Sequence, residues 1–276
     1  MHTEGAPYAV RRFSHGKGQA CVEMSRVTLP NRAYPLHIHQ AFSMALVIRE
    51  PQLFQVRTGL QEAPIGSVMF ANPWEPHRNV AQGPGGVAFF SVQFGSEALG
   101  FRSWGREPYF SQAVVLDPEL ARRMLALFDV LDRPDRTSQR DARFSDILDY
   151  LHLRQYLKWR GSRAKSGSNC LGRSLALIQN HDHRILSLAE LAAHVDRNPA
   201  YLCRAFRKHL GMAPHQLQTS GKVSKARALL LQGRKPAEVA YDLDFSDQSH
   251  LIRCFKRVFG ITPGQFQKSV NFVQYA

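Results

Sequence analysis

Short runs of hydrophobic, β-branched and aromatic residues follow one another from about residue 20 to residue 95. They are ACVEMSRVTL, FSMALVI, LFQV, SVMFA and VAFFSVQF. Proline, glycine and asparagine separate the runs, as expected for strands that are joined by turns. The pattern predicts an all-β sandwich or barrel, and we place the first domain at residues 1–115.

The hydrophobic period lengthens to about 3.6 residues between residues 117 and 159, which is the spacing of an amphipathic helix. One helix face would hold Leu120, Met124, Leu127, Phe128 and Leu131, and a second would hold Phe144, Ile147, Leu148, Leu151 and Leu157. These faces could close the bottom of the barrel or pair with the same helices of a second chain. We assign residues 116–159 to dimerisation and expect a homodimer.

Residues 160–172, RGSRAKSGSNCLG, contain few apolar side chains and many glycines, serines and charges. This composition is typical of an interdomain linker. From residue 173 to residue 276 the pattern is helical, and it contains a repeat. LCRAFRKHLGMAP at 202–214 returns as LIRCFKRVFGITP at 251–263, an offset of 49 residues (251 minus 202).

Both copies of the repeat carry the signals of a complete helix. In the first copy Asn198 is placed to cap the helix N-terminus, and Gly211 suits a left-handed C-terminal cap. Asp247 and Gly260 hold the same positions in the second copy. In each copy basic side chains lie opposite the apolar stripe.

A shorter apolar helix is predicted before each capped helix, at SLAELAAHV (187–195) and PAEVAYDL (236–243). A short helix, a tight turn and a longer helix with a basic outer face make a helix-turn-helix motif, whose second helix enters the DNA major groove. Two such motifs could occupy successive major grooves about 34 Å apart. The alternative is a helical bundle whose repeat only builds a core; the matching caps and basic positions favour DNA binding.

Residues from about 170 to 270 resemble the DNA-binding domain of the AraC/XylS family of transcription regulators. VAYDLDFSDQSHLIRCFKRVFGITPGQF is similar to the family signature of the second motif. The resemblance implies that a helix at about 214–232 joins the motifs rigidly, although Gly221 inside it costs roughly 1 kcal/mol relative to alanine. Asp244 replaces the glycine usual in the second turn, and Asp196 lies near the corresponding first turn. Aspartate tolerates a left-handed backbone better than most residues.

The resemblance also implies which side chains face DNA. Carried over by position, the base-facing residues are Ala200, Cys203 and Arg204 in the first motif and Gln248, Ser249, Ile252 and Arg253 in the second. Arg207 and Lys256 follow the motif phenylalanines, and we expect them to contact phosphates. Arg204 and Arg253 are the candidates for base recognition, because arginine to guanine is the commonest specific contact. The alternative for each arginine is a surface salt bridge.

PLHIHQAFSMALVI and PIGSVMFANPWEPHRN resemble the cupin-like ligand-binding domain that many of these regulators carry. The expected fold class is therefore α+β and multidomain: a cupin-like β-barrel with a helical pair, then an all-α domain with two helix-turn-helix motifs. On one strand His37 and His39 would face the same side. The candidates for binding a small-molecule effector are His37, His39, Arg57, Trp74, Glu75 and His77.

Three histidines on a barrel could instead bind zinc, iron or manganese. The chain would then be a metal-dependent cupin enzyme fused to a DNA-binding domain. Against this, Met44 stands where the cupin glutamate usually follows the second histidine by five residues, and it is a poor ligand for a hard cation. We expect an effector pocket with no metal, no cofactor and no catalytic residue, hence no enzyme. A regulator without small-molecule input is a further alternative.

Composition adds the expected partners. The 276-residue chain has a formal net charge of +14 and an isoelectric point near 10.1, which favours double-stranded DNA, with RNA polymerase as a further partner of an activator. Its four cysteines form no close pair, which argues against a zinc knuckle or a disulfide scaffold. We see no signal-peptide core and no run that could span a bilayer, so we expect a cytoplasmic protein with no membrane partner.

Overall fold

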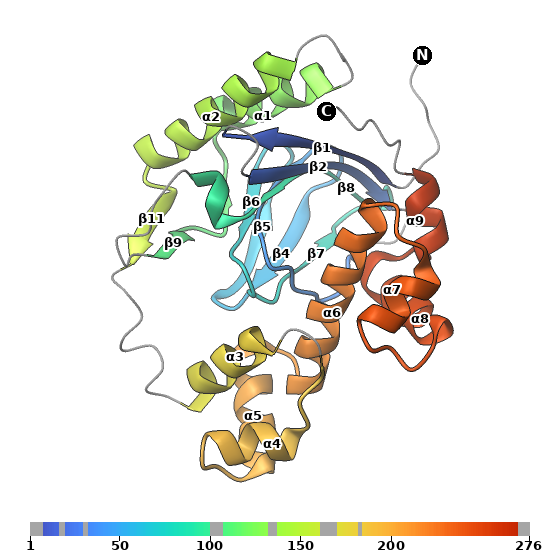
Figure 1. Ribbon diagram of the computed structural model, residues 1–276. Helices are drawn as coiled ribbons and strands as arrows, with labels where there is room; N and C mark the ends of the chain where they lie inside the picture. Colours follow the sequence, from blue (N-terminus) through green and yellow to red (C-terminus); the bar gives the residue numbers. More distant parts are fainter. Residues whose placement is uncertain are drawn as a thin grey trace.

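A computed structural model describes residues 8–16, 20–29, 33–99, 107–131, 137–160, 170–181 and 184–269. The chain forms a β-rich half with two helices across one face, followed by a purely helical half (Figure 1). The expected α+β architecture is therefore confirmed. Within the described residues, no helix has the length and apolar character needed to cross a membrane.

Two antiparallel sheets, which we call the barrel, form most of the N-terminal half. The larger sheet has the order β1 (Tyr8–His15), β2 (Ala20–Leu29), β8 (Val87–Phe94), β3 (Phe42–Val47), β6 (Val68–Ala71) and β10 (Val114–Val115). The smaller sheet has the order β5 (Gly59–Ala63), β4 (Gln52–Val56) and β7 (Arg78–Ala81). All five predicted runs form strands. The pattern missed β5, among others, because GLQEA is mostly exposed and carries no apolar alternation.

The larger sheet separates two cores, because successive side chains of a strand point to opposite faces. Ala45 and Phe89 face the barrel interior, whereas Met44 and Val92 face the outer side. On the outer side lie helices α1 (Pro118–Leu131) and α2 (Thr137–Leu153), which bury Leu120, Met124, Leu127, Phe144, Ile147 and Leu151. The apolar faces of the helical pair thus cover the sheet, which was one of the two predicted uses of these faces.

The second helix is shorter than its hydrophobic pattern predicted. It ends at Leu153, Gln155 has a left-handed backbone with φ of 59°, and Leu157 belongs to strand β11 (Leu157–Arg160). This strand pairs with β9 (Glu107–Phe110). Leu157 was therefore wrongly placed on a helix face, because a single apolar residue four positions after the helix fits a helical and an extended period equally well.

The C-terminal half consists of helices linked by short turns. They are α3 (Cys170–Asn180), α4 (Leu188–His194), α5 (Pro199–Leu210), α6 (Pro214–Leu231), α7 (Pro236–Asp242), α8 (Gln248–Phe259) and α9 (Pro263–Ser269). The joining helix predicted at about 214–232 is confirmed as α6. Because α3 begins at Cys170, the last three residues of the predicted linker are helical; its residues 161–169 lie outside the described ranges.

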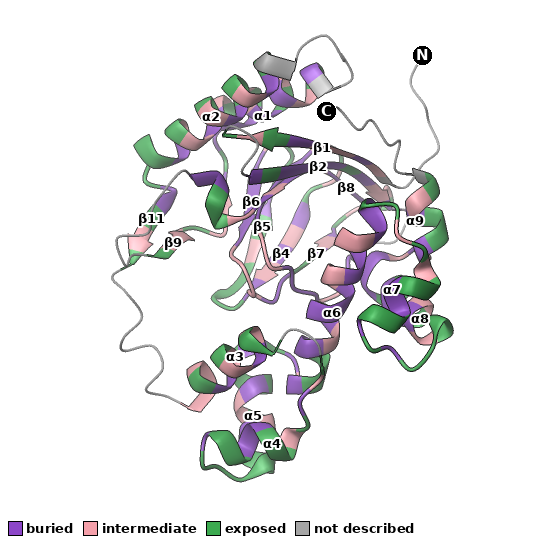
Figure 2. Cartoon of the chain, viewed as in Figure 1, coloured by how far each residue is buried: buried purple, intermediate pink, exposed green. Residues whose placement is uncertain are grey.

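Helix α6 is buried along much of its length (Figure 2). Val223, Ala226 and Leu230 belong to one hydrophobic cluster together with barrel residues such as Val27 and Phe89. The barrel and the second half of the helical domain thus share one continuous core.

Candidate DNA-binding surface and ligand cavity

The recognition helices α5 and α8 have closely similar ends. The Asn198 side chain accepts a hydrogen bond from the Ala200 N–H at 2.8 Å, and α5 ends at Gly211 with φ of 71°. The Asp247 carboxylate accepts a hydrogen bond from the His250 N–H at 2.6 Å, and α8 ends at Gly260 with φ of 75°. All four predicted caps are confirmed, so each motif contains its own local start and stop.

The turns between the helices of each motif are also alike. Asp196 and Asp244 both have a left-handed backbone, with φ of 52° and 53°. The prediction that aspartate adopts the conformation for which the family uses glycine is confirmed. In the second motif Lys222 of α6 adds a tertiary contact, because its ammonium group donates a hydrogen bond to the Asp244 carbonyl at 2.8 Å. Burial lowers the pKa of this ammonium group, and the nearby Asp244 opposes that shift.

All nine side chains expected to face DNA are accessible. Ala200, Arg204, Arg207, Gln248, Ser249, Arg253 and Lys256 are exposed, and Cys203 and Ile252 are partly exposed. The apolar stripes behind them are buried, with Phe206 and Phe255 fully so. Each recognition helix therefore presents a basic surface that no other described part of the chain covers.

The second candidate site is a cavity of about 60 Å³ inside the barrel. Its polar lining residues from the barrel are Ser25, Tyr34, His37, His39, Ser43, His77, Asn79, Ser91 and Gln93. The helical domain closes it with Ser224 and Arg227 from α6 and Phe259 from α8. The cavity thus lies at the interface between the two halves of the molecule.

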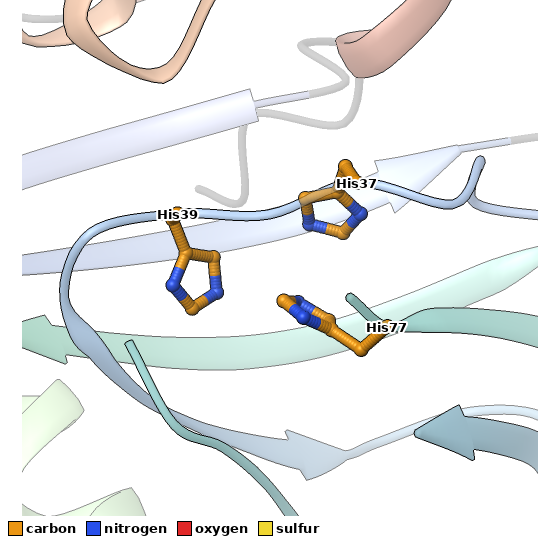
Figure 3. A group of neighbouring side chains, drawn as sticks. All are labelled: His37, His39 and His77. Atoms are coloured by element: carbon orange, nitrogen blue, oxygen red, sulfur yellow. The ribbon is translucent and has the colours of Figure 1, made fainter. Parts of the chain in front are cut away.

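Three of the predicted effector residues meet in this cavity. The rings of His37, His39 and His77 face one another (Figure 3), all three are buried, and their candidate metal-ligating atoms lie within 4.8 Å of one another. His37 and His39 lie in an irregular segment before β3 rather than on the predicted strand. His37 and His77 nevertheless form an isolated antiparallel bridge, with both N–H···O distances at 3.0 Å.

The backbone selects the tautomer of each ring. The Nδ1 atoms lie 2.9 Å from the Pro35 carbonyl oxygen for His37, 2.8 Å from that of Ala41 for His39 and 2.8 Å from that of Glu75 for His77. A carbonyl oxygen only accepts, so each Nδ1 carries the proton and each Nε2 keeps its lone pair. Burial lowers the pKa of all three imidazoles, and the neighbouring His77 lowers those of His37 and His39 further. The rings are therefore neutral near pH 7.

The remaining three predicted effector residues do not line this cavity. Arg57 is exposed in the turn between β4 and β5. Trp74 packs against α6 on the outside of the cavity. The Glu75 carboxylate accepts hydrogen bonds from the Asn72 backbone N–H at 3.2 Å and its side-chain amide at 2.9 Å, and thus shapes the loop before His77. These three residues were chosen by residue type alone, and in the fold their side chains lie outside the cavity.

Sequence reasoning missed the residue that links the two halves most directly. Arg227 forms an ion pair with Glu23 of β2 and donates a hydrogen bond to the Ser25 hydroxyl at 3.2 Å. The side chains of Arg227 and Glu23 are each 10% exposed. The sequence signal for this contact was the charge of Glu23. Val22 and Met24 face the outer core, so Glu23 between them is a charged residue on the inner face of the strand.

A second contact explains two residues that are poor helix formers. The Ser220 hydroxyl of α6 accepts a hydrogen bond from the Ile38 N–H at 2.9 Å. A Cβ atom on Gly221 would approach the Trp74 ring to 3.2 Å, which is closer than carbon atoms normally pack. Ser220 and Gly221 thus lie where the barrel loops come closest to α6, and the cost in helix propensity is offset by this close approach.

A β-rich domain with an internal cavity, followed by two helix-turn-helix motifs with accessible basic helices, defines a class of transcription regulator that combines ligand binding with DNA binding. The family model of the AraC-like ligand binding domain matches residues 21–157, and that of the helix-turn-helix domain matches residues 191–269. The chain belongs to the AraC/XylS family of transcription regulators.

Curated relatives are similar over part of their length. An uncharacterized HTH-type transcriptional regulator, YbfI of Bacillus subtilis (strain 168), is 28% identical over 148 residues, which are 53% of this chain and 54% of that protein. The arabinose operon regulatory protein of Salmonella typhimurium is 26% identical over 179 residues, 64% of this chain and 53% of the relative. The chain spans about half the length of these relatives.

Solved structures share the complete fold. The apo form of a ToxT variant from Vibrio cholerae strain SCE256 superposes with a TM-score of 0.59 at 10% identity, covering 93% of this chain and 99% of that one. Wild-type ToxT of the same strain with bound unsaturated fatty acid has a TM-score of 0.57 at 12% identity and full coverage of both chains. At such low identity the similarity shows a common fold.

Proposed function

We propose that this protein is a sequence-specific DNA-binding transcription regulator whose activity is set by a small molecule in the barrel cavity. The observation that carries the proposal is the position of α6. This one helix joins the two helix-turn-helix motifs and also supplies Ser224 and Arg227 to the cavity wall. A ligand in the cavity therefore contacts the element that positions both recognition helices.

The size of the cavity indicates how binding would be coupled to DNA recognition. The cavity of about 60 Å³ is much smaller than typical small-molecule sites, which measure roughly 300–1,000 Å³. A larger effector fits only if α6 moves away from the barrel. Such a ligand stabilises the displaced arrangement through its differential affinity for the two states. The ToxT structure that contains an unsaturated fatty acid supports small-molecule binding by a chain of this fold.

The remaining parts of the proposal concern the assembly and the place of action. The curated relatives are transcription regulators, which supports a binding role rather than an enzymatic one. We propose a cytoplasmic homodimer that contacts through α1 and α2, where Leu125 stays exposed although most of the apolar stripe is buried against the sheet. RNA polymerase is the further partner if the protein activates transcription. Light scattering on the purified chain tests the dimer.

The central experiment is the selection of bound DNA from a random pool with the full-length protein. We expect a site with two conserved boxes about 10–10.5 base pairs apart, because the two recognition helices would enter successive major grooves. The double variant Arg204→Ala, Arg253→Ala serves as the control and should recover no enriched sequence. Recovery of random DNA by the wild-type protein would refute sequence-specific binding.

Cavity involvement is tested in the same assay. Ser43→Leu places a larger apolar side chain into the cavity, and we expect it to preserve the DNA site while abolishing the effect of any metabolite that shifts wild-type DNA affinity. Ser14→Leu, on the exposed surface of β1 and not among the residues that line the cavity, is the matched control and should retain that effect. A metabolite effect that survives Ser43→Leu unchanged would place the effector site elsewhere.

A further inference from the structure

We propose that His37, His39 and His77 form a binding site for one divalent first-row transition-metal cation. The site lies in the cavity of the proposed function, and the inference rests on that function only for the use the metal would serve. The three donors come from two separate loops, which the backbone bridge between His37 and His77 holds together. None of the three is exposed, and their rings converge on one point (Figure 3).

The spacing of the donors suits one ion after small side-chain rotations. Imidazole nitrogens bind zinc at about 2.0–2.1 Å, which separates two nitrogens of a tetrahedral site by about 3.4 Å. The three ligand atoms here lie within 4.8 Å of one another, so they must approach by about an ångström or a little more. The cavity in front of the rings provides the room for that rotation.

The hydrogen bonds behind the rings are those of metal-ligating histidines. Such histidines almost always donate their second N–H to a carboxylate, backbone carbonyl or water, which fixes the tautomer and the ring orientation. Here all three Nδ1 atoms donate to backbone carbonyls, of Pro35, Ala41 and Glu75. Among the described residues, no hydrogen bond reaches any of the three Nε2 atoms. Three lone pairs therefore point into one small space with no proton donor between them.

The donor set selects the class of ion. Three neutral imidazoles suit zinc, ferrous iron, cobalt, nickel or copper, whereas magnesium and calcium require oxygen ligands. No aspartate or glutamate is among the described residues that line the cavity. Three protein ligands leave at least one coordination position open, as in sites that bind water or a further ligand. That open position faces the cavity, whose wall also carries the Arg227 guanidinium, paired with the Glu23 carboxylate.

Met44, on which the expectation of no metal rested, lies away from the three rings. It is fully buried in the outer core beside α1 and α2, so it neither ligates a cavity metal nor blocks one. Its neighbours Ser43 and Ala45 line the cavity instead. Met44 therefore says nothing about metal binding in the cavity, which depends on the geometry of the three histidines.

The test is a cobalt(II) titration of full-length protein that has been stripped with chelator. We expect one equivalent to bind with the visible d–d absorption of a nitrogen-coordinated ion, and zinc to displace it. His77→Ala and His37→Ala should each weaken binding by more than about 100-fold, because even the loss of a group that only hydrogen-bonds to a ligand costs about 10–100-fold. His152→Ala, an exposed histidine on α2, is the matched control and should bind as the wild type does.

A second measurement does not depend on the folding of a variant. X-ray absorption of the wild-type protein loaded with one equivalent of zinc should show three imidazole ligands. A zinc ion with fewer than three imidazole ligands, or cobalt binding that His77→Ala leaves unchanged in a folded protein, would overturn the proposal. Neither outcome would affect the DNA selection, which is carried out with chelator present, so failure of the metal site and failure of the regulator are distinguishable.

Discussion

The two helix-turn-helix motifs are nearly identical in local structure and differ in their support. The first motif consists of α4 and α5. The barrel contributes only loop residues to its core, namely Leu36, Ile38 and Trp74. The second, α7 and α8, shares one continuous core with the barrel interior, and α9 contacts β1. In Figure 1 the first motif lies at one end of α6, below the barrel, whereas the second lies beside the barrel.

The repeat in the sequence therefore encodes local geometry and not tertiary role. Leu210 and Phe259 end the two recognition helices at equivalent positions, since 259 minus 210 is the repeat offset of 49. Leu210 packs inside the first motif, whereas Phe259 also lines the ligand cavity. We therefore expect a cavity ligand to act on the second motif through Phe259, and on the first through α6 and through Ile38, which lines the cavity and belongs to the core of the first motif.

The largest loss is expected from breaking the ion pair between α6 and the barrel, beside the second motif. Glu23→Ala leaves the Arg227 guanidinium buried without its carboxylate, and we expect the free energy of unfolding to fall by about 3–5 kcal/mol. Urea denaturation measures the loss. Hydrogen exchange should increase in β2, α6 and α8 and remain unchanged in α4 and α5.

Asp242→Ala provides the control for that experiment, because it breaks an exposed pair with Arg234. An exposed pair contributes about 1 kcal/mol or less. A similar loss for both variants, or faster exchange in both motifs, would mean that the barrel supports the two motifs equally.

The next effect concerns base recognition by the two motifs. Arg204→Ala and Arg253→Ala should each weaken binding to the selected site by about 1–3 kcal/mol and binding to random DNA much less, because each removes one contact to a base edge. Fluorescence anisotropy with both DNAs measures the difference. Equal losses on both DNAs would show that these arginines hold only the phosphate backbone, with recognition assigned to Gln248 or Ser249 instead.

A smaller effect tests whether the two motifs are locally equivalent. Gly211→Ala and Gly260→Ala place a Cβ atom on a left-handed residue, which costs about 1–2 kcal/mol. The added atom would meet Leu36 at 3.6 Å and Leu29 at 3.8 Å, both ordinary contacts, so the two losses should agree. Urea denaturation compares them. A markedly larger loss for Gly260→Ala would mean that docking on the barrel also constrains the local cap.

The weakest effect is expected from the phosphate contacts. Arg207→Ala and Lys256→Ala should weaken binding to selected and random DNA about equally and reduce the slope of log affinity against log salt by roughly one each. Affinity measured over a range of salt concentrations checks this. A loss confined to the selected site would instead assign base recognition to these side chains.

Much of the fold was predictable because the signals act over a few residues. Asn198 and Asp247 cap their helices through hydrogen bonds to the next few residues, and Asp196 and Asp244 have left-handed backbones in turns of only a few residues. Leu157 was misplaced for the opposite reason. Only the pairing of β11 with β9, across nearly fifty residues of chain, decides that it is extended.

Near-neighbour patterns in the chain were enough to specify five of the strands, the two motifs, their caps and the accessible basic helices, because periodicity and capping depend on adjacent residues. They also pointed to His37, His39 and His77. Tertiary packing placed Arg227 against Ser25 at a separation of 202 residues, and it excluded Arg57, Trp74 and Glu75 from the cavity. A cavity wall is made by whichever faces of distant elements pack together, and no local pattern distinguishes a face that packs on a neighbour from one that lines a space.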